Sequence, residues 1–168
     1  EKLVTAILAI DSILMRLQLL LRGSKTLDVP VIFTEHCPEK LGFTVASLRS
    51  VAQNACYVTK TWFGATRQQE FCTQLHSSER RQIVVAGAEA HVCVMQTALG
   101  LLEQEYEVFL VIDATGSREQ QDKEIAIDRL CSAGAIPVTS EMVLFEWLAH
   151  ADADCFHEVL SMIKSIGK

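Results

Sequence analysis

Short runs of apolar, mostly β-branched residues alternate along this chain with longer segments in which apolar residues recur every three to four positions. The short runs predict strands at residues 4–10, 29–33, 57–59, 83–86, 108–112 and 136–139. The periodic segments predict helices at residues 13–21, 44–53, 66–75, 94–102, 119–133, 140–149 and 155–166, with Ser140 as an N-cap and Gly134 as a C-cap. This order predicts a three-layer α/β/α sandwich with a mostly parallel central sheet, built by residues 1–168 as one domain.

Three polar residues follow predicted strands, and they are the first candidates for chemistry. Asp11 follows the first run, Lys60 the third, and Cys93 comes shortly after the fourth. In open parallel sheets the ligand-binding crevice lies beyond the carboxyl ends of the strands. The first run is not followed by a G-x-G-x-x-G pattern, so a dinucleotide site is not indicated.

Cys93 lies where the buried strand at 83–86 passes into a helix, after a break at Gly87. A thiol at such a position meets the free N–H groups and the positive end of the helix dipole. Both favour the thiolate, so Cys93 is expected to be an acidic and nucleophilic cysteine. The alternative is a structural cysteine that acts as a small hydrophobic residue.

The composition narrows the class of protein. The chain has 49% hydrophobic residues and a net charge of −6, which argues against nucleic-acid binding. Its six cysteines form no C-x-x-C pair, so we expect reduced thiols and a cytoplasmic location. No apolar run approaches the ~20 residues of a membrane span. The sequence begins at Glu1, so an organellar location stays open.

Several motifs resemble those of the isochorismatase-like cysteine hydrolases. Residues 87–98 are similar to the family's glycine-to-cysteine motif, residues 59–64 to its lysine segment, and Ile10-Asp11 to its first catalytic segment. Residues 29–42 and 108–145 resemble the subgroup of isochorismatase domain-containing proteins. The resemblance implies an isochorismatase-like, Rossmann-like topology. Residues 11–29 are shorter than it implies, which leaves open whether a loop near Ser12 is missing.

The resemblance also implies a mechanism. Asp11 would take the proton of Cys93 and pass it to the leaving group, and Lys60 would stabilise the thiolate. Cys93 would form a thioester that water hydrolyses. The backbone N–H groups of Glu89 and Cys93 would form the oxyanion hole, with a cis peptide bond between Ala88 and Glu89.

A small pocket is expected around this triad. Its candidate residues are His36, Trp62, Phe63, Ala88 and Arg118. Trp62 and Phe63 would form its wall, or would instead belong to the core. Arg118 would bind a substrate carboxylate, or would pair with Asp113 or Glu119.

The expected reaction is hydrolysis of a small amide or another C–N bond in a small-molecule substrate. His36 has no second histidine nearby, so we expect no metal and no cofactor. Two alternatives stay open: an oligomeric binding protein with a vestigial site, and a redox-sensitive thiol protein. The apolar surface of the Cys93 helix and of residues 141–147 predicts a homo-oligomer, unless both helices are simply buried.

Overall fold

The structure, a computed structural model, describes residues 3–166. The strands are β1 (Ile32–His36), β2 (Cys56–Lys60), β3 (Gln82–Ala88), β4 (Glu107–Gly116) and β5 (Ile136–Val138). The helices are α1 (Ile10–Thr26), α2 (Pro38–Leu41), α3 (Ala46–Arg49), α4 (Gln69–Ser77), α5 (Met95–Glu103), α6 (Gln120–Ser132), α7 (Ser140–Leu148) and α8 (Phe156–Ile166). Three single turns are η1 (Val4–Ala6), η2 (Ala65–Arg67) and η3 (Ala90–Val94).

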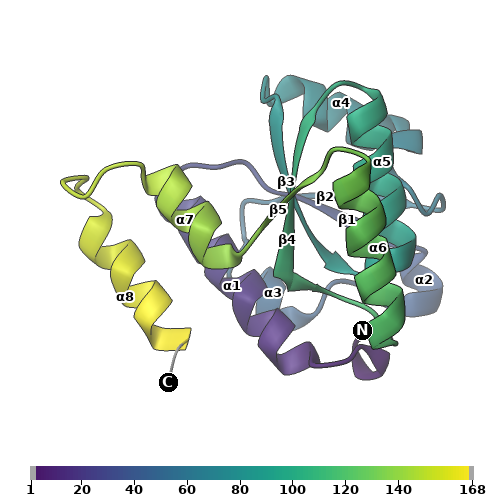
Figure 1. The fold of residues 1–168 in the computed structure, drawn as a ribbon, viewed down its shortest axis with the longest axis horizontal. Coiled ribbons are helices and arrows are strands. Elements are labelled where there is room, and N and C mark those ends of the chain that lie inside the picture. Colours follow the sequence, from purple (N-terminus) through teal and green to yellow (C-terminus); the bar gives the residue numbers. More distant parts are fainter. Residues whose placement is uncertain (1–2, 167–168) are drawn as a thin grey trace.

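Parallel strands lie between two layers of helices. Among the described residues β1 pairs with β2, and β3, β4 and β5 pair in that order, all in parallel. Helices α1, α7 and α8 lie on one side of the strands, and α4, α5 and α6 lie on the other (Figure 1). The predicted α/β/α sandwich is therefore confirmed.

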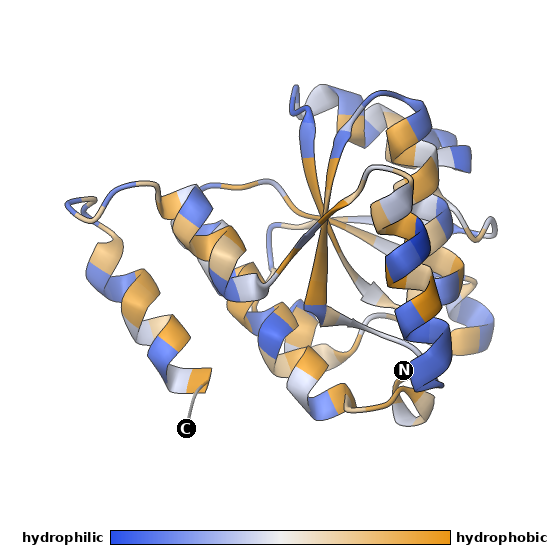
Figure 2. Ribbon diagram, viewed as in Figure 1, coloured by the Kyte–Doolittle hydropathy of each residue, from blue (hydrophilic) through white to orange (hydrophobic). Residues whose placement is uncertain are grey.

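Strand β4 is the centre of the core. Its residues Val108, Leu110 and Val111 are completely buried, and the ribbon is hydrophobic along most of β3 and β4 (Figure 2). Neighbouring strand residues point to opposite faces. Leu110 accordingly packs with the α4–α5 layer around Leu101, whereas Val111 packs with the α1–α7 layer. The continuous apolar run in the sequence reflects burial on both faces.

The sheet is split between β1 and β3. Within residues 3–166, neither strand pairs with anything on its second edge. A cavity of about 1190 Å³ lies there, lined by both strands and by α1 and α4. Residues Ile83–Gly87 are consequently only half-buried. The strand predicted at residues 83–86 is present, but it is half-buried and not buried, because one of its edges faces the cavity.

The predicted strand at residues 4–10 was also wrong. Val4–Ala6 forms the turn η1, and α1 already begins at Ile10. The residues from Ile10 to Leu21 include strong helix formers, and their apolar members recur at helical spacing. Asp11 in the first turn adds a favourable interaction with the helix dipole. Ile10 and Asp11, which were predicted to end a strand and follow it, are therefore the first two residues of α1.

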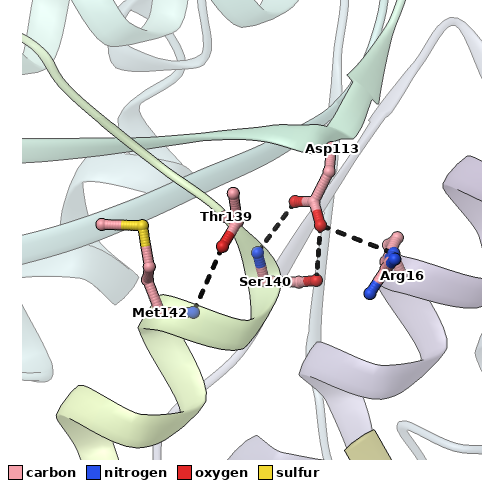
Figure 3. A network of polar contacts seen from close by, with 5 residues as sticks. All are labelled: Arg16, Asp113, Thr139, Ser140 and Met142. Atoms are coloured by element: carbon pink, nitrogen blue, oxygen red, sulfur yellow. Dashed lines mark hydrogen bonds and ion pairs between the residues drawn. The ribbon is translucent and has the colours of Figure 1, made fainter. Parts of the chain in front are cut away.

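A polar network joins α1, β4 and α7 (Figure 3). The Asp113 carboxylate accepts hydrogen bonds from the N–H (2.8 Å) and Oγ (2.7 Å) of Ser140, and it pairs with Arg16 at 3.5 Å. The N-cap of α7 is Thr139, whose Oγ1 accepts the N–H of Met142 at 3.3 Å. Ser140 is thus not the predicted cap. It is the first helical residue and fixes α7 to β4.

Candidate active site

Lys60 and Cys93 meet at the carboxyl ends of their strands. Lys60 is the last residue of β2 and only 2% exposed. Its Nζ donates hydrogen bonds to the carbonyls of Trp62 (3.1 Å) and Phe63 (2.8 Å) and to Cys93 Sγ at 3.5 Å. The two carbonyls hold the ammonium group against the sulfur. An ammonium group in this position stabilises a thiolate.

Cys93 lies in the π-helical turn η3, which connects β3 to α5. Gly87, the second-last residue of β3, has a φ of +122°, a conformation that disfavours residues with a Cβ atom. The Ala88–Glu89 peptide bond is cis, at the position that the resemblance implied. The N–H groups of Val92 (3.2 Å) and Val94 (3.1 Å) both donate to the Glu89 carbonyl at the start of this turn.

Glu89 and Arg118 form an ion pair beside this turn. Glu89 is 8% exposed, and its Oε1 accepts from Arg118 Nε at 2.7 Å. This hydrogen bond and the charge of Glu89 raise the pKa of Arg118 above its ordinary value. The proposed pairing of Arg118 with Asp113 or Glu119 was therefore wrong. Arg118 instead fixes η3 to the end of β4. Arg118 and Ala88 both line the cavity that also contains Cys93.

His36 lies beside Lys60 on the neighbouring strand, in register with it. Its Nδ1 is buried and has no hydrogen-bond partner among the described residues, and its ring lies 5.0 Å from that of Phe63. Burial and then the Lys60 charge lower the pKa of His36, although the carbonyls of Trp62 and Lys60 act in the opposite direction. His36 is therefore neutral near pH 7 and lines the same cavity as Cys93.

Sequence reasoning missed the buried Glu35. Its Oε1 accepts the N–H of Thr44 at 2.8 Å and the guanidinium of Arg49 at 3.2 Å. Burial raises the pKa of Glu35, but these two partners outweigh it and leave the pKa below its ordinary value. The available signal was its position two residues after the apolar run at 29–33, at the carboxyl end of a predicted strand. Glu35 ties the loop after α2 to the strand that carries His36.

The structure does not bring Asp11 to the other two members of the predicted triad. Asp11 is exposed in the first turn of α1. The cavity is lined by Ile10 and Ile13 but not by Asp11. The helix buries its apolar stripe against the sheet, and Asp11, one residue further around it, points away.

The aromatic pair after Lys60 is at the surface and not in the core. Trp62 is 52% exposed and Phe63 50% exposed. Phe63 lines the cavity, as predicted for a pocket wall, whereas Trp62 instead lies under the Arg67 guanidinium at 5.7 Å. The backbone of the pair matters as much as its rings, because both carbonyls hold Lys60.

Neither a metal cluster nor a membrane span is found in the described part of the chain. Residues 3–166 contain no group of three or more His, Cys, Asp and Glu side chains that could hold a metal ion. Over the same residues, no helix has the length and hydropathy to cross a bilayer. The expected independence from metal stays a prediction.

Known sequences and structures are similar to this chain over most of its length. The family model described as "Isochorismatase domain" matches residues 2–142. This chain belongs to the isochorismatase family. Isochorismatase domain-containing protein 2 of Xenopus laevis is 40% identical over 145 residues, which are 86% of this chain and 69% of that relative. Isochorismatase domain-containing protein 1 of Salmo salar is 34% identical over 148 residues.

The isochorismatase fold extends over nearly all of this chain. A solved structure described as a MAR1 ribonuclease from Caenorhabditis elegans superposes with a TM-score of 0.91 and 33% identity, and the match covers 98% of this chain and 84% of that one. This chain covers a smaller share of the curated relatives than of the solved structure. The match to the Salmo salar protein covers 88% of this chain, which spans only about half, 52%, of that relative.

Proposed function

We propose that this chain is a cysteine hydrolase that cleaves a small amide or another C–N bond. The observation that carries the proposal is the hydrogen bond from the buried Lys60 Nζ to Cys93 Sγ at 3.5 Å. It joins a nucleophile to a cation at the end of a cavity where a small substrate can bind.

In the first step the Cys93 thiolate attacks the substrate carbonyl and forms a tetrahedral intermediate. The N–H groups of Cys93 and Glu89 would donate to its oxyanion. The C–N bond then breaks and leaves a thioester on Cys93. Water hydrolyses the thioester, which releases the acid and restores the thiolate.

The leaving amine needs a proton, and Lys60 is the residue in position to supply it. Of the described titratable side chains, Lys60 is the one that hydrogen-bonds to Cys93 Sγ. A general acid must lie within hydrogen-bonding reach of the reacting atoms. The Lys60 ammonium would protonate the amine and would regain a proton from the attacking water. This assignment replaces Asp11, which is exposed on α1.

The test is hydrolysis of a panel of small primary amides and carbamoyl compounds, followed by ammonia release. We expect Cys93→Ser and Lys60→Met to lose at least about 100-fold in rate. The matched controls are Cys72→Ser, at another half-buried cysteine, and Lys40→Met, at an exposed lysine. Intact-mass spectrometry should trap an acyl group on Cys93. Equal turnover by Cys93→Ser would exclude the nucleophile.

A second candidate is a redox-sensitive thiol, and the exposed position of Asp11 favours it. A thiolate held by Lys60 can react with peroxide without any further acid or base. The sulfur gains one oxygen as sulfenic acid, and the peroxide is reduced to water. Oxidation of Cys93 before Cys72 or Cys131, with no turnover of any amide, would favour this candidate over the hydrolase.

A further inference from the structure

Lys60 Nζ donates to three acceptors that lie around it. The carbonyls of Trp62 and Phe63 accept at 3.1 Å and 2.8 Å, and Cys93 Sγ accepts at 3.5 Å. An ammonium group has three donors and no acceptor. Two of its protons are therefore bound to main-chain carbonyls, and the third points at the sulfur.

Loss of that third proton would turn the ammonium group into an amine without moving it. The two carbonyls would still accept the remaining N–H groups, and the side chain of Lys60 is only 2% exposed. The lone pair of the amine would occupy the position of the lost proton and would point at Cys93 Sγ. Lys60 would then be a nucleophile aimed at the sulfur.

Cys93 can meet a small oxidant but is not bonded to a second thiol. Its side chain is half-buried and lines the cavity of about 1190 Å³, and all the cysteines of the chain are free. Redox-sensing cysteines often lie next to a second cysteine that attacks the sulfenic acid. In residues 3–166 the nitrogen nucleophile in contact with Cys93 Sγ is that of Lys60. An amine therefore occupies the position that a resolving thiol takes elsewhere.

We infer that hydrogen peroxide joins Cys93 and Lys60 by a covalent sulfur–nitrogen bond, a sulfenamide. In the first step the thiolate attacks one peroxide oxygen and the O–O bond breaks. The Lys60 ammonium gives its third proton to the departing hydroxide, which leaves as water. The products are a sulfenic acid on Cys93 and a neutral amine on Lys60. The sulfur has lost two electrons, and the peroxide has gained them.

In the second step the Lys60 nitrogen attacks the Cys93 sulfur and the S–O bond breaks. The hydroxide leaves as water with one proton of the amine. One thiolate, one ammonium group and one peroxide thus yield one S–N bond and two waters. The link removes the nucleophile and the cation together, and excess dithiothreitol would reduce it to the thiol and the amine. The inference rests on the thiolate–ammonium pair of the proposed function.

The experiment treats the chain with hydrogen peroxide in the absence of reductant. Intact-mass spectrometry should show the loss of two hydrogen atoms, and dithiothreitol should restore them. Any amide turnover should fall at least tenfold and recover in parallel. The remaining thiols are then blocked with iodoacetamide and the chain is digested with trypsin. Trypsin does not cleave after a lysine whose amine is substituted, so residues 50–67 should stay one peptide, linked to residues 82–118.

A disulfide between Cys56 and Cys93 would remove the same two hydrogen atoms, and the peptide map separates the two links. In the disulfide Lys60 stays cleavable, so residues 50–60 and not 50–67 would be linked to residues 82–118. Cys56→Ser should therefore keep the cross-link, as should Lys40→Met at an exposed lysine. Lys60→Met should lose it. If Lys60→Met does not fold, Cys56→Ser and the wild-type peptide map decide without it.

Three results would overturn the inference. They are a sulfinic or sulfonic acid on Cys93 with trypsin still cleaving after Lys60, a disulfide of Cys93, and a Cys93 that iodoacetamide alkylates but peroxide leaves reduced. All three leave the amide-hydrolysis proposal standing, because ammonia release tests it separately. A cross-link in a chain without amide turnover supports the inference and contradicts the hydrolase. A Cys93 that reacts with neither reagent contradicts both.

Discussion

Replacing Lys60 by methionine tests the centre of the proposed site. The substitution keeps an unbranched side chain and removes the ammonium group that contacts Cys93 Sγ at 3.5 Å. It also leaves the carbonyls of Trp62 and Phe63 without this donor. We therefore expect two separate effects: slower alkylation of Cys93 and a lower free energy of unfolding.

The expected slowing follows from the distance. At 3.5 Å two unit charges attract by about 1 kcal/mol in water and by about 5 kcal/mol at an effective dielectric constant of 20. A loss of this size corresponds to a factor between about 7 and about 3000 in the stabilisation of negative charge on the sulfur. A less stabilised sulfur is more nucleophilic, which offsets about half of the effect on a logarithmic scale. The alkylation rate should fall between about 3-fold and about 50-fold.

The assay is limited alkylation with iodoacetamide, with each cysteine quantified by peptide mass spectrometry. Cys72, whose Sγ contacts the Thr66 carbonyl at 3.2 Å, reports the alkylation rate elsewhere in the same molecule. Lys40→Met controls for the loss of an exposed lysine. The two unpaired carbonyls cost about 1–3 kcal/mol each, so the measurement is made well below the unfolding transition. A folded Lys60→Met that alkylates as fast as the wild type would show that Lys60 does not activate Cys93.

Four further outcomes are expected. Asp11→Asn should change neither Cys93 alkylation nor amide turnover by more than about twofold, because Asp11 is exposed; a larger loss in either rate contradicts the assignment of the proton to Lys60. The pKa of His36 in the folded chain lies below its ordinary value of 6.5. As the pH drops below about 6.5, the unfolded chain therefore binds this proton more readily than the folded chain, and the free energy of unfolding falls. His36→Gln should flatten the loss of melting temperature between pH 7 and pH 5, and unchanged curves would contradict the shift. Met142 (47% exposed) and Phe145 (39% exposed) form an apolar face on α7. Replacing both by lysine should dissociate the predicted oligomer, as measured by sedimentation. A wild-type chain that is already monomeric would exclude the oligomer. Amide turnover should survive dialysis against EDTA, and activity that is lost and then restored by zinc would show a metal requirement.

The sequence could predict those parts in which local pattern and burial agree. The run at residues 108–112 became β4, because an apolar strand longer than its neighbours is stable only where both faces are covered. Lys60 and Cys93 were placed together because both follow parallel strands, whose carboxyl ends lie at the same side of a sheet. Those predictions needed only the direction of the strands.

The run at residues 4–10 shows where such reasoning fails. Its apolar residues suit a strand, and the resemblance implied one, but Ile10 and Asp11 also begin a helical pattern that extends to Thr26. A short apolar run does not distinguish a strand from the start of a helix. The helix forms instead of the strand, because each added helical residue gains a backbone hydrogen bond and because α1 buries Leu19 and Leu20.

The split sheet and the candidate site are physically connected. Lys60 belongs to the β1–β2 sheet, whereas Cys93 follows β3 of the other sheet, so the contact between them spans the gap between β1 and β3. A change in the width of the gap therefore changes the distance from Nζ to Sγ. Lengthening it from 3.5 Å to about 5 Å would lower the attraction from about 5 to about 3 kcal/mol at the same effective dielectric constant. Because the carbonyls of Trp62 and Phe63, which hold Lys60, follow β2, the width of the gap and the reactivity of Cys93 should change together.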